Sequence, residues 1–426
     1  MQPPSLSEDL QLEIIARTDD PTTVVRCAAA SKPLRRAILD PAFRRRRLAV
    51  VRAASKGGFD SALVADVSYR IREHGNGRTN DLTAISTSRR LQIDSSLLVS
   101  FEPAFSRDGI LVLWRNRELE RRRRWNGFRP EPEVQLLVCN VFTGDITSRP
   151  PQIGARGYKG IAGDVYRPAL LTTEKECADD GRFFKLLVMD KYLHIQSFSS
   201  QDDGKWDHIH QYKRPAIASC ISSQMCSAPA AVIGSTAHWL CHLVKPNPLN
   251  VAMIILAVTV NADTAKATAI ELPEGCLTSL MESWNASEED PAKGRLILVT
   301  TTTDDKATAS RLSLLVAEPM IISMWTLITS GEGSKGWSRQ MVIHRHEIKR
   351  QLGTGMETYQ ATMRFKAFAG RSGTVVFWIE RVGLVRLSLV TKKAVLVRAC
   401  SENSQDVQVC LHDVNLASLL SGMKPF

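Results

Sequence analysis

Hydrophobic residues follow two different periods along this chain of 426 residues. Up to about residue 43 they recur at helical spacing: Leu6, Leu10 and Ile14 lie four positions apart, and Ile15 widens the stripe to one helical face. From about residue 80 they gather in short β-rich runs separated by turn residues, which is typical of strands. The pattern predicts a small all-α module followed by a large all-β domain.

The N-terminal pattern predicts three short helices. Acidic residues at 8 and 9 fall in the first turn of the first helix, where the helix dipole favours negative charge. Asp20 and Pro21 supply a cap and a first-turn proline for a second helix, whose apolar side contains Val24 and Val25. Pro33 ends that helix near Ser31-Lys32, because proline cannot continue it.

A third helical piece begins with Leu34 and Ile38, and Asp40-Pro41 repeats the cap-and-proline signal before Phe43. These boundaries place the helical module in residues 1–45. Residues 46–80 mix arginine with scattered Leu and Val, and we expect them to form a helical linker that ends in the turn-rich stretch 75–80.

The region 81–426 shows many short strand-like runs and few helical periods, which favours a β-sandwich, barrel or propeller. The predicted strands are 97–101, 110–114, 134–142, 183–189, 193–198, 232–233, 239–244, 251–260, 295–301, 312–317, 324–328, 341–344, 375–379, 384–390 and 394–400. A short closing helix is expected over 414–423.

Internal recurrences favour the propeller. Residues 198–206 and 329–337 share a strand, a polar glycine loop and a tryptophan, with a serine seven positions before each tryptophan. A second hairpin pattern occurs at 138–145 and 258–264, and residues 387–396 resemble its core. A period of about 40 to 50 residues would give about six to eight four-stranded blades.

The N-terminal helices resemble the F-box, the helical motif that binds the Skp-family adaptor of SCF ubiquitin ligases. The resemblance rests on Leu6, Asp9, Leu10, Glu13, Ile14, Ile15, Arg17, Val25, Arg26, Lys32, Arg35, Ile38, Pro41 and Phe43, whose order and spacing match the motif. Ser7, Ser31 and Leu34 stand where the family pattern usually has proline, cysteine and tryptophan.

The whole architecture resembles plant-type F-box proteins with a C-terminal kelch-like or F-box-associated β-propeller. The resemblance implies the substrate-recognition subunit of an SCF-type E3 ubiquitin ligase, which binds the Skp-family adaptor, and through it a cullin, and holds a protein target on its β domain. It implies no catalytic group on this chain. The F-box core and adaptor-binding residues would be Leu6, Leu10, Ile14, Ile15, Val24, Val25, Leu34, Ile38 and Phe43.

The net charge of +11 is concentrated in part in arginine clusters. One cluster, 44–47, adjoins the helical module. The other is a basic loop with flanking aromatic residues, which consists of Arg115, Arg117, Arg121, Arg122, Arg123, Arg124 and Arg129. Such a loop could bind phosphates or an acidic protein. The alternative function is therefore a non-ligase β-propeller module for an acidic partner or nucleic acid, with nucleic acid the less favoured of the two.

Nine cysteines without a C-x-x-C pair indicate reduced thiols, and no signal peptide is visible. The longest apolar run, 251–260, is too short to span a bilayer. We therefore predict a cytoplasmic or nuclear protein without a membrane partner.

No motif for catalysis, metal binding or a cofactor has convincing context. The G-x-G-x-x-G run 331–336 is followed by strand-like residues, whereas a dinucleotide site needs a helix there. Two His/Cys groups, His194 with 208 and 210, and His238 with Cys241 and His242, lack paired zinc-ligand spacing. We expect no cofactor, no metal and no enzymatic activity.

Overall fold

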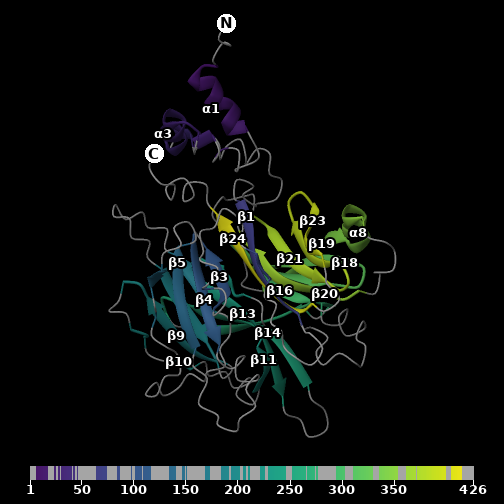
Figure 1. The fold of residues 1–426 in the computed structure, drawn as a ribbon. Helices are drawn as coiled ribbons and strands as arrows, with labels where there is room; N and C mark the ends of the chain where they lie inside the picture. Colours follow the sequence, from purple (N-terminus) through teal and green to yellow (C-terminus); the bar gives the residue numbers. More distant parts are fainter. Residues whose placement is uncertain are drawn as a thin grey trace.

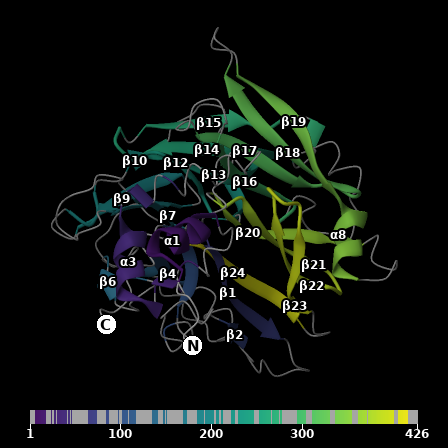
Figure 2. The same cartoon turned by 90° about the horizontal axis from the view of Figure 1, so that it is seen from above.

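Six antiparallel sheets arranged in a ring form the body of the protein in the computed structural model (Figures 1 and 2). The structure describes residues 6–17, 24, 27–28, 30–40, 42–43, 46, 64–73, 84–86, 97, 101–107, 109–116, 134–140, 146–148, 150, 168–172, 184–190, 193–201, 205–207, 210–211, 221–225, 229–245, 252–264, 266–273, 275–276, 294–302, 310–329, 335–353, 361–370, 372–399 and 404–414.

Five of the sheets consist of strands consecutive in sequence, and we number them as blades 1 to 5. Blade 1 contains β3 (Glu102–Arg107), β4 (Ile110–Asn116), β5 (Val134–Asn140) and β6 (Ile146–Ser148); blade 2 contains β7 (Ala169–Thr172), β8 (Phe184–Met189), β9 (His194–Ser199) and β10 (His210–Gln211). Blade 3 contains β11 (Ile221–Met225), β12 (Ala231–Ile233), β13 (Thr236–Lys245), β14 (Ala252–Asn261) and β15 (Ala267–Glu271). Blade 4 contains β16 (Leu296–Thr302), β17 (Ser310–Ala317), β18 (Ile321–Thr329) and β19 (Lys335–His344); blade 5 contains β20 (Met363–Ala369), β21 (Thr374–Ile379), β22 (Gly383–Ser388) and β23 (Ala394–Ala399).

The sixth sheet, which we call the closing sheet, joins strands from both ends of the chain. It has the order β2 (Ala84–Ser86), β1 (Val64–Glu73) and β24 (Ser404–Val414). β1 and β24 pair antiparallel from Val64 opposite Val414 to Glu73 opposite Ser404. β24 also contacts β3 of blade 1 and β20 of blade 5, so it closes the ring between them.

This arrangement confirms a β-propeller-like fold. The described residues form five blades and the closing sheet, and the predicted six to eight blades are not confirmed. The reason lies in the repeat length. The third strands of successive blades end at residues 140, 199, 261, 329 and 388, which are 59 to 68 residues apart. Segments between strands lengthen each repeat beyond the 40 to 50 residues that four strands and tight turns need.

Every recurrent hairpin seen in the sequence occupies the same place in its blade, between the third and fourth strands. These hairpins are β5–β6, β9–β10, β14–β15, β18–β19 and β22–β23. The two tryptophans of the recurrence occupy equivalent positions. Trp206 forms an isolated β-bridge with Phe198 of β9, and Trp337 pairs with Leu327 of β18. The sequence similarity therefore marks one structural position in all five blades.

Three predicted elements are corrected. The expected helical linker over 46–80 is wrong at 64–73, because those residues form β1 and pair with β24. Leu97 is helical, and the strand predicted at 97–101 begins at Glu102. The closing helix predicted at 414–423 is contradicted at Val414, which ends β24; the rest of that range lies outside the described residues.

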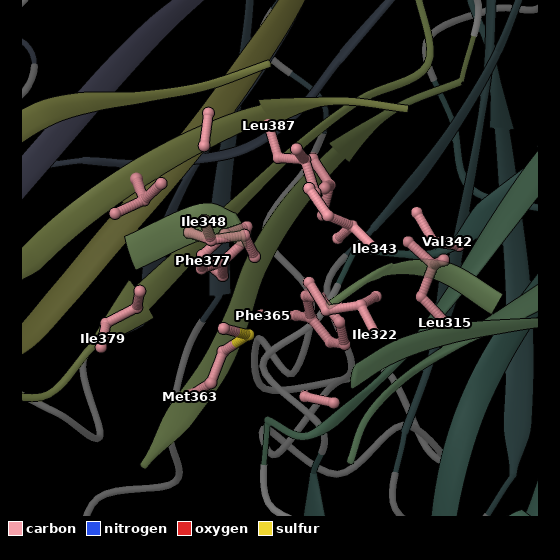
Figure 3. Close-up of a cluster of buried hydrophobic side chains, with 14 of the residues drawn as sticks. Leu315, Ile322, Val342, Ile343, Ile348, Met363, Phe365, Phe377, Ile379 and Leu387 are labelled. Atoms are coloured by element: carbon pink, nitrogen blue, oxygen red, sulfur yellow. The ribbon is translucent and has the colours of Figure 1, made fainter. Parts of the chain in front are cut away.

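Apolar side chains fill the spaces between neighbouring sheets. Along β21, Val375, Phe377 and Ile379 face blade 4, whereas Val376 faces the closing sheet. Figure 3 shows the cluster between blades 4 and 5, which includes Ile348 of a rim helix. Because blade 5 is covered on both faces, β21 reads as a nearly continuous apolar run without alternation.

The rim helix is α8 (Arg345–Leu352), which the sequence pattern did not predict. Arg345 fixes its first turn, since its guanidinium donates to the carbonyl of Pro319 at 2.9 Å and to the carbonyl of Ala361. Gly353 ends the helix in the left-handed region at φ 67°, which favours glycine. Only eight residues long, the helix is held by these tertiary contacts and by buried Ile348, since isolated helices of this length are unstable.

A pH-dependent stability follows from His238 of β13, one of the residues considered for zinc. Burial lowers the pKa of His238 to about 4, and Nδ1 lies 2.8 Å from the Thr259 hydroxyl. The folded state holds this imidazole neutral, while the unfolded state binds a proton below about pH 6.5. Stability is therefore lost as the pH falls from about 6.5 towards 4, by about 2 to 3 kcal/mol for this residue.

The measurement is urea unfolding of the wild type and His238→Gln at pH 7 and pH 4.5. Glutamine keeps a hydrogen-bonding group beside Thr259 but does not titrate in this range. The variant should lose about 2 to 3 kcal/mol less than the wild type on acidification. Equal losses in both proteins would contradict the assignment.

Candidate functional site

Two helices of the N-terminal module are described in full: α1 (Glu8–Arg17) and α3 (Lys32–Leu39). Val24, Cys27, Ala28 and Ala30 are helical as well, in the region of the predicted second helix. The helices thus lie where the pattern placed them, and Figure 1 shows α1 and α3 outside the ring of sheets. Their presence does not by itself identify the module as an F-box.

The module has a small hydrophobic core of its own. It consists of Ile15, Ala16, Val24, Ala28, Ile38 and Phe43, with Leu12, Cys27, Leu34 and Leu39 packed partly against it. A core of this size stabilises only marginally, so other groups must fix the helices.

Hydrogen bonds at the helix ends help to hold the helices in place. In α1 the Ser7 carbonyl accepts from the Gln11 backbone N–H at 3.1 Å, and the Gln11 side-chain amide donates to the Leu6 carbonyl at 2.8 Å. In α3 the hydroxyl of Ser31 accepts from the Leu34 N–H at 3.4 Å. These bonds satisfy helix-end groups that would otherwise lack partners, and they hold Leu6 in line with the helix.

A pair of arginines orients the helix further. Glu13 accepts from Arg17 one turn later at 2.7 Å, and Arg46 reaches the other oxygen of the same carboxylate. Arg46 belongs to the basic run that follows the module, so this contact ties the end of the module back to α1. Partly exposed ion pairs of this kind contribute little individually.

Exposed apolar residues lie on the side of α1 away from the core of the module, and we call Leu6, Leu10 and Ile14 the α1 stripe. These residues are 54%, 47% and 52% exposed. Leu10 and Ile14 share one helix face because they are four residues apart, and Leu6 precedes the helix by two residues. Large aliphatic side chains in water cost free energy that burial against a partner recovers. The stripe is a candidate docking surface.

The nine residues predicted for the helical module therefore divide into two groups. Ile15, Val24, Ile38 and Phe43 are buried in its core, and Leu34 is partly buried there. Leu6, Leu10 and Ile14 are exposed, and Val25 lies outside the described residues. Sequence spacing alone could not separate these roles, because both groups are apolar and helical.

The basic loop is represented in the structure only by Arg115, near the end of β4 and opposite Gln135 of β5. The other members, Arg117, Arg121, Arg122, Arg123, Arg124 and Arg129, lie outside the described residues.

Two of the histidines considered for zinc contact neighbouring side chains instead. His194 contacts buried Asp190 at 2.9 Å across the β8–β9 turn, and His238 contacts Thr259. Among the described residues no three His, Cys, Asp or Glu side chains gather to hold a metal. The glycine run 331–336 leads into β19, a strand, so its last part lacks the helix that a dinucleotide site requires. None of the helices in the described ranges is long and apolar enough to cross a membrane.

Comparison with protein families identifies the β domain. A family model described as a domain of unknown function, DUF7595, matches residues 66–426. The chain belongs to the DUF7595 family. The match starts within β1 and so includes the whole ring, whereas the helical module precedes it. No curated protein matches the chain.

Solved structures share the general β architecture with this DUF7595 protein at very low identity. The catalytic domain of a Coprinopsis cinerea GH62 α-L-arabinofuranosidase is 10% identical over 80% of this chain and 96% of its own, with a TM-score of 0.32. The polysaccharide lyase Uly1 is 9% identical over 80% and 64%, with a TM-score of 0.33. The WD40 domain of SCAP from fission yeast is 9% identical over 78% and 86%, with a TM-score of 0.23. Likeness this distant carries no argument about function.

The division of the module into core and surface gives a paired test. Ile38→Ala removes a buried side chain and should cost about 2 to 5 kcal/mol, enough to open the module. Leu10→Ala removes an exposed side chain and introduces the best helix former, so stability should stay unchanged.

Hydrogen exchange measured by mass spectrometry on the full chain distinguishes the two. Amides of α1 and α3 should exchange faster in Ile38→Ala only, with β-domain peptides as the internal reference. Equal protection in both variants would show that the small core does not hold the module together.

Proposed function

We propose that this protein is the substrate-recognition subunit of an SCF-type E3 ubiquitin ligase. The helical module binds the Skp-family adaptor, and through it a cullin, while the β domain binds the target protein. The observation that carries the proposal is the α1 stripe: Leu6, Leu10 and Ile14 occupy matching positions of the F-box-like pattern. Leu10 and Ile14 are exposed on α1, and Leu6 is exposed just before it.

The energetics of the module support the need for a partner. Its core contains six buried residues, and three large aliphatic side chains on and just before α1 are exposed. Covering such a stripe removes apolar surface from water at about 25 cal/mol per Å². A partner with an apolar groove would therefore both bind the module and stabilise it.

In this role the chain accelerates ubiquitin transfer by proximity. The module sits outside the ring in Figure 1, so a partner on the α1 stripe leaves the outer surfaces of the blades open for a target. Holding the target close to a ubiquitin-charged enzyme raises its effective concentration and needs no acid, base or nucleophile from this chain.

The test is calorimetric titration of the full chain with a purified Skp-family adaptor. The wild type should bind with one-to-one stoichiometry, and the double variant Leu10→Asp with Ile14→Asp should bind at least 100-fold more weakly, because two charges would enter an apolar interface. Met320→Asp is the matched control, since Met320 is 60% exposed but lies on blade 4. It should bind like the wild type.

Folding of each protein is checked by the hydrogen exchange of α1 and α3. A folded wild type that does not bind the adaptor would refute the proposal. Equal binding by the double variant would place the contact elsewhere than the α1 stripe. In either case the basic loop around Arg115 becomes the alternative site to probe.

A further inference from the structure

The outer strand of blade 5 differs from those of the other blades. Outer strands are exposed to unwanted pairing, and proteins protect them by making them short or polar. β6 and β10 have three and two residues, β15 exposes Thr268 and Glu271, and β19 exposes Ser338, Arg339 and Gln340 beside Met341. β23 has the sequence AVLVRA and exposes two adjacent large aliphatic side chains, Val395 and Leu396, whereas Ala394 is buried and Val397 is half-buried. In the described part of the chain it pairs with β22 alone.

A side chain of α8 forms hydrogen bonds with the first backbone groups on the outer edge of β23. The Gln351 amide donates to the Lys392 carbonyl at 3.1 Å and accepts from the Ala394 N–H at 2.6 Å. A primary amide offers the same donor and acceptor as a peptide group, so Gln351 occupies the place of a neighbouring strand. Glu347 orients it by accepting from the same amide nitrogen at 2.9 Å. Figure 2 shows α8 at the rim of the ring.

Beyond this contact, no strand among the described residues pairs with the outer edge of β23. The Lys393 carbonyl accepts from the Ser388 N–H of the hairpin at 3.0 Å, so residue 393 points towards β22. Successive residues of a strand direct their peptide groups to opposite edges. The carbonyl of Ala394 and both peptide groups of Leu396 therefore point outward, in continuation of the two groups that Gln351 holds.

The side chains at this edge are apolar and exposed on both faces of the sheet. Val395 and Leu396 are 38% and 39% exposed, and as neighbours in a strand they face opposite sides. An added strand would cover both with its own alternating side chains.

The positive charge of blade 5 determines which kind of strand can pair with β23. Residues 361–399 contain eight lysines and arginines and one acidic residue, Glu380, so this blade carries much of the net charge of +11. Lys393 and Arg398, both exposed, flank the apolar pair. Antiparallel pairing with a second copy of β23 would bring Arg398 of each copy towards the lysines of the other, and like charges opposed across strands destabilise pairing. An acidic segment would instead place carboxylates opposite these cations, and opposite charges across paired strands stabilise pairing.

We propose that the outer edge of β23 binds an extended acidic peptide segment with alternating apolar residues, which adds as a fifth strand to blade 5. Peptide groups of Ala394 and Leu396 supply the hydrogen bonds, Val395 and Leu396 the apolar contact, and Lys393 and Arg398 the charge selection. One part of this inference rests on the proposed function, namely that the segment belongs to the target protein of the ligase.

The probe is a fluorescein-labelled heptapeptide of alternating glutamate and valine, titrated with the full chain and followed by fluorescence anisotropy. The wild type should bind it and should not bind the matched peptide of lysine and valine. Affinity should fall at least tenfold in the variant Lys393→Glu with Arg398→Glu. The control variant Lys266→Glu with Arg311→Glu has the same net charge, with its substitutions on exposed residues of blades 3 and 4, and should bind within twofold of the wild type.

A second pair of variants tests the backbone contact. Leu396→Pro removes an outward N–H, a change that edge strands tolerate, and should weaken binding at least tenfold. Leu396→Ala keeps that N–H and should weaken binding less. Equal effects of these two variants would exclude strand addition, even if the charge reversal acted as expected.

Three outcomes would overturn the inference: no peptide binding by the wild type at 1 mM, equal binding of both peptides, or concentration-dependent dimers that Leu396→Pro abolishes. Adaptor binding is measured in parallel. Peptide binding without adaptor binding would refute the ligase role alone, and adaptor binding without peptide binding would refute the β23 site alone.

Discussion

The pairing of β1 with β24 is the constraint on which the rest of the structure depends. Two strands from opposite ends of the described chain pair over ten residues and complete the ring between blades 1 and 5. His412 of β24 is fully buried and bonds to the Ser106 hydroxyl of β3 at 2.8 Å, which links the closing sheet to blade 1. Without this sheet the cores beside blade 5 and blade 1 would face water, so the closure stabilises every blade indirectly.

The same closure explains how one chain can carry two separate surfaces. Each blade is covered on both faces by its neighbours, which leaves only the rim and the ends of the ring for binding. The helical module precedes the ring and has its own core, so a partner on α1 does not need to disturb the blades. The proposed receptor role, in which one chain holds an adaptor and a target, would use this independence.

The rim itself is not uniform. Most outer strands are short or polar, which limits unwanted pairing. Blade 5 is the exception, since Gln351 covers the start of β23 while apolar and basic residues follow. In the proposed strand addition this edge receives the added strand, and its positive charge disfavours pairing with a second copy.

The sequence by itself determined the class of each region and the position of the repeated hairpins, because strand and helix periods and turn residues are local properties. The third-to-fourth strand hairpins and helices α1 and α3 were readable for that reason. The blade count, the assignment of residues 64–73 to β1 and the existence of α8 were decided by the tertiary structure. β1 forms because it pairs with β24, which is distant in sequence, and α8 forms because of the contacts of Arg345 and buried Ile348. Ile15 is buried and Ile14 is exposed because only one side of α1 meets the core. Such contacts join residues far apart in the chain, and no local pattern records them.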